Sequence, residues 1–109
     1  MATIEDFERI DMRVGLVLEA GELPGARKPA YQLLIDFGPL GRKRSSAQLT
    51  DLYRAEELVG RRVVAVVNFP PRRIAGFSSE VLVLGVPDDS GAVVLLLPER
   101  DVPVGGRVF

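Results

Sequence analysis

The side chains that could act on a ligand are concentrated in two stretches of this chain, residues 42–49 and 68–79. The first, RKRSSAQL, places three cations before two hydroxyls and an amide. The second, NFPPRRIAGFSS, combines two arginines with two phenylalanines and two prolines. Guanidinium groups bind carboxylates and phosphates, and aromatic rings supply apolar contact area. These residue types predict a surface for an anionic or partly apolar ligand.

Side chains suited to catalysis are scarce. The chain has no histidine and no cysteine, which removes the commonest general base, the thiol nucleophile and thiolate metal sites. A serine nucleophile would need a nearby lysine, and Lys28 and Lys43 are the only two lysines. The acidic pairs Glu56-Glu57 and Asp88-Asp89 are adjacent in sequence, and neighbours in a helix or turn do not converge on one site. We therefore expect no enzymatic activity, no metal and no cofactor.

Length and composition are those of one globular domain, residues 1–109, with 47% apolar and 27% charged residues. No apolar run approaches the roughly 18 residues needed to cross a bilayer, so we expect no membrane insertion. The N-terminal stretch MATIEDFERI is acidic and amphipathic and has no signal-peptide core. The expected location is the cytoplasm.

The charges are unevenly distributed along the chain. Residues 1–23 carry two basic and six acidic side chains, residues 24–79 carry ten and four, and residues 80–109 carry two and five. The net charge of −1 therefore hides a basic middle segment. Because local patches attract anionic partners, this segment is compatible with a nucleic-acid partner.

Runs of apolar or alternating residues predict strands at 12–19, 31–37, 42–49, 62–67, 80–86 and 92–97. The 42–49 segment is polar and could also be a loop. The unbroken apolar run at 62–67 indicates burial on both faces, and residues 80–86 are again nearly all apolar and should form a buried strand. Gly15, inside the first strand, predicts a bulge or a sharp bend there.

Two short helices are expected. The first follows a capping box formed by Thr3 and Asp6, and the second covers residues 51–59 and ends at Gly60. Five or six short strands, with a helix between the third and fourth, favour an all-β fold. The candidates are a five-stranded Greek-key barrel of the oligonucleotide/oligosaccharide-binding (OB) type and another small barrel. Because Pro70 and Pro71 cannot donate to a ladder, residues 68–79 should project as a loop from the rim.

The candidate ligand-binding residues share a position in or beside these two stretches. They are Arg42, Arg44, Ser45, Ser46, Gln48, Asn68, Phe69, Pro71, Arg72, Arg73, Phe77, Ser78 and Ser79. Several have a simpler structural interpretation: the cations of 42–44 could solvate an edge strand, Phe69 could be a core residue and Asn68 could bond local backbone. Phe77 follows Gly76 and is the better candidate for an exposed apolar contact. Glu80 should be paired with an arginine or a backbone amide.

Apolar side chains at the two ends of the chain exceed what one small barrel needs. They are Ile4, Phe7 and Ile10 at helical spacing, together with Val104, Val108 and Phe109. A helix of about two turns is unstable alone in water, so its apolar stripe must pack on the barrel or on a second subunit. We expect a homodimer that uses these residues.

Five strings in combination are similar to one known family. They are DMRVG (11–15), ARKPAY (26–31), SSAQ (45–48), VVNFPPR (66–72) and SEVLVLG (79–85). With them the chain, from Ile4 to Phe109, resembles the CsaA family of export-related chaperones. That family lies within the wider class of tRNA-binding OB domains found on aminoacyl-tRNA synthetases.

The resemblance implies an OB barrel, a homodimer and broad binding of unfolded or preprotein polypeptide, with a possible link to the secretion ATPase. The tRNA-binding branch has a Ser-Gly-Leu-like step where this chain has Ser46-Ala47-Gln48-Leu49. It often carries a Ser-Glu-Gly-Met step where this chain has Ser79-Glu80-Val81-Leu82. Both differences favour the chaperone branch. A tRNA-binding module and a docking subunit are the alternatives.

Overall fold

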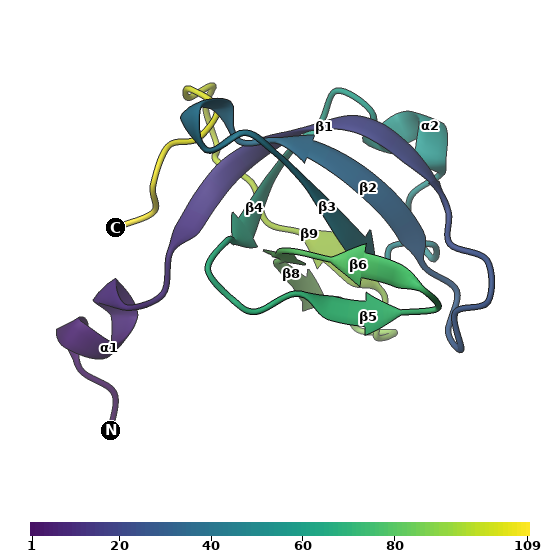
Figure 1. Cartoon of the computed structure of the whole chain (residues 1–109), viewed down its shortest axis with the longest axis horizontal. Helices are drawn as coiled ribbons and strands as arrows, with labels where there is room; N and C mark the ends of the chain where they lie inside the picture. Colours follow the sequence, from purple (N-terminus) through teal and green to yellow (C-terminus); the bar gives the residue numbers. More distant parts are fainter.

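The computed structural model describes residues 1–109, and its centre is a five-stranded antiparallel sheet that curls into a nearly closed barrel (Figure 1). The strand order is β3-β2-β1-β4-β7. These strands are β1 (Met12–Glu22), β2 (Tyr31–Asp36), β3 (Arg42–Ala47), β4 (Arg62–Val66) and β7 (Leu82–Val83). A helix lies between β3 and β4 in the chain, as in OB barrels. The predicted fold class is confirmed.

The remaining elements are short. They are α1 (Ile4–Glu8), the 3-10 helix η1 (Gly38–Leu40), α2 (Ala55–Leu58), β5 (Arg72–Ile74), β6 (Phe77–Ser79), β8 (Gly85–Pro87) and β9 (Val93–Leu95). Strands β5 and β6 form one hairpin, and β8 and β9 form another. None of the helices has the length and apolar character that crossing a membrane requires.

The core lies inside the barrel and follows the alternation of its strands. On β2, Tyr31, Leu33 and Ile35 are buried, while the residues between them are half-buried. On β4, Val63, Ala65 and Val66 are buried, close to the two-sided burial expected from the unbroken apolar run.

Gly15 allows close packing against β2 and the residue after it, and it does not form a bulge. The register of the β1–β2 pair shifts between Val17 and Glu19, whereas Gly15 remains in regular pairing with Val63. A Cβ atom at Gly15 would lie 2.4 Å from Ile35 Cγ2 and 2.7 Å from Phe37 Cε1. The strand does contain an irregularity, but the prediction placed it at the wrong residue.

The apolar run 80–86 is not one buried strand. Leu84 donates its N–H to the Val64 carbonyl, and its own carbonyl accepts from Leu96. The chain therefore leaves β4 at this residue and begins to pair with β9. Leu82 is 47% and Val86 50% exposed, so the expectation of one buried strand over this segment was wrong.

Both predicted helices exist, with different bounds. The Thr3 hydroxyl accepts from Asp6 N–H at 3.2 Å and the Asp6 carboxylate from Thr3 N–H at 2.9 Å, which confirms the capping box. Helix α1 buries no residue and projects from the barrel (Figure 1). The second helix begins at Ala55, because the Glu57 carboxylate caps Arg54 N–H at 2.9 Å. Gly60 follows with φ +89°, as its predicted role as a helix stop requires.

Candidate functional site

Residues 72–79, within the segment expected to be a projecting loop, form a β-hairpin, and residues 68–71 before it are in no strand. Strand β5 starts after Pro71 and pairs with β6 through a two-residue turn at Ala75 and Gly76. These two residues have φ values of +51° and +79°, the combination that a type I′ turn requires. Ala75 is the one non-glycine residue with positive φ. The hairpin is therefore a defined arm beside the barrel.

Polar contacts join β3 to the hairpin and to the residues after it. Ser46 donates its N–H to Ser79 Oγ at 2.9 Å. Arg44 donates its N–H to Glu80 Oε1 at 2.9 Å, and Glu80 returns its own N–H to the Arg44 carbonyl at 2.8 Å. Glu80 thus pairs with a backbone amide, one of its two predicted partners. These bonds close the gap between β3 and β7.

Two predicted ligand-binding serines belong to this closure. Ser45 is 0% exposed and donates its hydroxyl to the Ser46 and Val81 carbonyls. Ser79 is 8% exposed, and its hydroxyl oxygen accepts from Ser46. The Ser45 side chain is not available at the surface, whereas Ser79 keeps a small exposed area and lines one of the surface hollows described below. The expectation that Ser45 contacts ligand is corrected to a structural role, because a buried hydroxyl must be bonded within the protein. Ligand contact by Ser79 stays a prediction.

A basic hollow of about 470 Å³ lies between the loop after β1, the end of β3 and the hairpin. A methyl group at Gly25 would lie 3.6 Å from Ala75 Cβ, so the loop and the hairpin turn are in contact distance. The lining residues are Gly25, Ala26, Arg27, Lys28, Ala30, Ser46, Gln48, Arg72, Arg73, Ile74 and Ala75. Four of them are cations and none is a carboxylate.

Two further hollows share Ser46, Arg72 and Ile74 with the basic hollow, and we call the three together the groove. The apolar hollow, of about 200 Å³, is lined by Ser46, Phe69, Pro70, Arg72, Ile74, Ser79, Glu80, Val81 and Leu82. The strand hollow, of about 350 Å³, is lined by Ser46, Ala47, Gln48, Leu49, Arg72, Ile74, Leu82, Val83, Leu84, Gly85 and Val93. The groove therefore runs from a basic end to apolar walls.

The cations of the basic hollow have no carboxylate partner. The five ion pairs of the structure use Arg9, Arg13, Arg54, Arg100 and Arg107. Glu80 is the one carboxylate lining the groove, and its Oε1 accepts from a backbone amide. Like charges gathered without a counter-charge produce a positive local potential, so this end of the groove attracts anions.

The two phenylalanines exchange their expected roles. Phe69 is 42% exposed and lines the apolar hollow. Phe77 is half-buried on β6, opposite Ile74, and lines none of the three hollows. The interpretation of Phe69 as a core residue was wrong. Strand pairing places Phe77 within the hairpin and leaves Phe69 on the unpaired segment before it.

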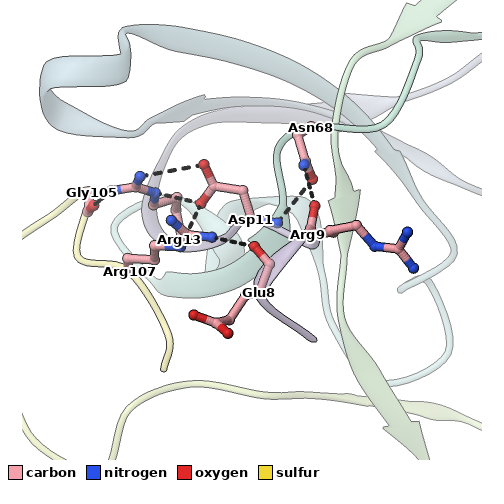
Figure 2. Close-up of polar contacts among 7 residues, drawn as sticks. All are labelled: Glu8, Arg9, Asp11, Arg13, Asn68, Gly105 and Arg107. Atoms are coloured by element: carbon pink, nitrogen blue, oxygen red, sulfur yellow. Dashed lines mark hydrogen bonds and ion pairs between the residues drawn. The ribbon is translucent and has the colours of Figure 1, made fainter. Parts of the chain in front are cut away.

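Asn68 has a structural role, but it bonds the backbone of a segment distant in sequence and not the local backbone that was expected. Its side-chain nitrogen donates to the Arg9 carbonyl at 2.8 Å and its side-chain oxygen accepts from Asp11 N–H at 2.9 Å (Figure 2). Each end of the exposed amide thus makes one hydrogen bond within the protein, and contact of Asn68 with a ligand stays a prediction. Asn68 attaches the segment after α1 to the end of β4.

An arginine pair extends this polar cluster to the C-terminal tail. Arg13 donates to the Asp11 carboxylate at 2.7 Å and to the Gly105 carbonyl at 3.1 Å. Arg107 donates to the Glu8 carbonyl at 2.9 Å (Figure 2). The two ends of the chain are thereby held together, although α1 itself remains outside the barrel.

The other predicted residues divide into two groups. Ser46, Gln48, Arg72 and Arg73 come together in the basic hollow. Arg42 and Arg44 lie outside the groove on β3, on the same side of the strand as Ser46 by alternation. Pro71 and Ser78 line none of the three hollows, although Pro70 does.

The groove also uses residues that sequence reasoning missed. Arg27 and Lys28 were not among the candidate ligand-binding residues, and Leu82 was assigned to a buried strand. Their signal was available in part: both cations contribute to the excess positive charge of residues 24–79. Their proximity to Arg72 could not be predicted, since it depends on how the barrel closes.

The two carboxylates whose pKa is clearly shifted lie away from the groove. Hydrogen bonds from the Ser90 hydroxyl and amide lower the pKa of Asp88, and the Arg54 amide lowers the pKa of Glu57. Neither residue lines a hollow of the groove. Histidine, cysteine and carboxylate side chains nowhere gather into a group of three that could hold a metal. The chemistry available in the groove is therefore binding through charge, hydrogen bonds and apolar contact.

An antiparallel barrel with a groove bounded by its β1–β2 loop and a later hairpin defines a binding domain of the OB class. The family model described as a putative tRNA-binding domain matches residues 12–107. The chain belongs to this family.

Solved structures and curated relatives agree with that assignment. The CsaA chaperone of Bacillus anthracis is 54% identical with a TM-score of 0.94, over 100% of this chain and 99% of that chain. The CsaA chaperone of Picrophilus torridus is 47% identical with a TM-score of 0.93, over 100% of both chains. These neighbours confirm the resemblance to CsaA.

A curated relative belongs to the synthetase branch. The methionine–tRNA ligase of Methanococcus maripaludis strain C7 is 39% identical over 105 residues, which are 96% of this chain. This chain spans only 15% of the length of that enzyme. The match therefore concerns one part of the ligase.

Proposed function

We propose that this protein is a non-catalytic chaperone that holds unfolded or export-bound polypeptide in the groove. The observation that carries the proposal is the groove itself, in which Phe69, Ile74 and Leu82 adjoin four unpaired cations, on a chain similar throughout to CsaA chaperones. Apolar walls bind the side chains that an unfolded chain exposes, and guanidinium groups bind its carbonyls and carboxylates. Holding by binding equilibrium alone lowers the free concentration of unfolded chain without ATP. Transfer to the secretion ATPase would follow release.

If the groove holds unfolded polypeptide, variants that remove groove side chains should suppress the aggregation of an unfolded protein less well. We expect Phe69→Ala with Arg72→Ala to require about tenfold more protein for equal protection, because truncating two central contacts costs about 1.4 kcal/mol or more. Light scattering of a chemically unfolded model protein diluted into buffer measures this. Leu52→Ala with Arg100→Ala is the matched control, since it removes an exposed apolar side chain and an exposed cation that line no part of the groove. Equal suppression of aggregation by the two double variants would show that the groove is not the site that holds polypeptide.

A second candidate function is RNA binding, which the family and the unpaired cations support. If four cations contact phosphates, affinity for tRNA should fall about 50-fold between roughly 50 mM and 200 mM salt, because bound counterions are released. Filter binding of labelled tRNA across this range measures the slope. No detectable tRNA binding at about 50 mM salt would remove this candidate.

We also propose that the protein acts as a homodimer. Ile4 is 72% and Phe7 37% exposed, and Phe109 is fully exposed. Ile10, Val104 and Val108 are half-buried. A second apolar surface was not predicted: Val86 and Val94, opposite each other on the β8–β9 hairpin, are 50% and 41% exposed. Exposed apolar side chains gathered on a short helix or a hairpin are typical of protein interfaces. A second copy of the chain would cover them.

A further inference from the structure

The two ends of the groove differ in chemical character. Arg27 and Lys28 on the β1–β2 loop face Arg72 and Arg73 on the hairpin across the basic hollow, and no carboxylate lines it. The apolar hollow instead has Phe69 and Leu82 in its walls. A ligand that satisfies both ends carries negative charge next to apolar groups.

The four cations of the basic hollow are free to bind the negative charge of such a ligand. All four are exposed and none belongs to an ion pair of the structure. Four like charges around one hollow repel each other, and an anion in their midst removes that repulsion. A ligand with lysines or arginines at this end would add to the repulsion instead.

The two ends are continuous at a shared set of residues. Ser46, Arg72 and Ile74 line both the basic and the apolar hollow. One extended segment can therefore cross from the first to the second. An extended polypeptide rises about 3.3 Å per residue and alternate side chains share a face, so carboxylates and apolar groups a few residues apart reach the two ends together.

We propose that the groove selects polypeptide segments in which Asp or Glu neighbours apolar residues, and discriminates against Lys- and Arg-rich segments. This inference rests on the proposed polypeptide-holding function and names its substrate class. Polypeptide fits the groove better than RNA does, because base-stacking surfaces use several exposed aromatics and the groove has only Phe69.

The test uses three short labelled peptides with the same apolar residues, flanked by glutamates, by lysines or by serines. At low salt the glutamate peptide should bind about tenfold more tightly than the serine peptide, and the lysine peptide more weakly than either. Fluorescence anisotropy on the full chain measures the three dissociation constants. Failure of every peptide to bind contradicts the proposed function itself. Equal binding of the glutamate and lysine peptides overturns the charge selection alone.

Variants separate the basic hollow from the net charge of the protein. Arg27→Ala with Lys28→Ala should abolish most of the preference for the glutamate peptide over the serine peptide, measured as the ratio of their two dissociation constants. Arg54→Ala with Arg100→Ala changes the net charge equally at residues outside the groove and should preserve the preference. A preference lost equally in both double variants overturns the proposal. Single-stranded RNA that binds more tightly than the glutamate peptide and loses affinity in the first variant also overturns it, by assigning the hollow to nucleic acid.

Discussion

Replacing Gly15 by alanine should destabilise the protein by about 3 kcal/mol, the upper part of the usual range for overpacking a core. The added methyl would lie 2.4 Å from Ile35 Cγ2 and 2.7 Å from Phe37 Cε1, well inside van der Waals contact. Both neighbours are 0% exposed, so neither can move outward into solvent. Because Gly15 pairs with Val63 on β4, the backbone of β1 cannot retreat without breaking the barrel ladder.

Urea unfolding followed by far-ultraviolet circular dichroism measures this loss. The protein concentration must be held constant, since dimerisation would add to the apparent stability. Gly21→Ala is the matched control on the same strand, where an added methyl meets nothing within 4 Å. We expect that control to differ from the wild type by less than about 0.5 kcal/mol. Equal unfolding midpoints for the two variants would contradict the close packing at Gly15.

Removing the apolar side chains of α1 should convert the dimer to monomer. Ile4→Ala with Phe7→Ala deletes two exposed side chains from a helix that buries none of its residues in its own barrel. In a two-fold dimer each substitution occurs twice, so the dissociation constant should rise about 100-fold. Analytical ultracentrifugation of wild type and variant over a concentration series measures it.

The control for this experiment removes apolar surface elsewhere. Leu52→Ala with Val59→Ala truncates two side chains that are 47% and 50% exposed near α2 and should leave the association unchanged. A wild type that is monomeric at every concentration contradicts the dimer. If the variant dimerises as well as the wild type, α1 is not part of the dimer interface. The exposed apolar face of β8 and β9 would then be the better candidate.

The polar cluster at Asn68 connects the proposed dimer contact at α1 with the groove. Asn68 holds the segment after α1 through Arg9 and Asp11, and Phe69 of the apolar hollow is the next residue. Asn68, together with the bond from Arg107 to the Glu8 carbonyl, therefore attaches the segment around α1 beside one end of the groove.

Local features of this protein were determined by the sequence alone. The capping box at Thr3 and Asp6 and the stop at Gly60 depend on residues within a few positions, so their types are sufficient to predict them. The alternation of Tyr31, Leu33 and Ile35 identifies a strand and its buried face in the same way. The absence of histidine and cysteine excludes whole classes of chemistry at once.

Tertiary structure decided which side chains reach a ligand. Phe69 and Phe77 are the same residue type on the same segment, and only the pairing of β5 with β6 makes the first exposed and the second half-buried. Ser45 and Ser46 are adjacent, yet closure of β3 onto Glu80 and Val81 buries the first and leaves the second in the groove. Arg27 meets Arg72 because the barrel brings distant segments together, and such convergence depends on packing free energy over the whole chain and not on local residue types.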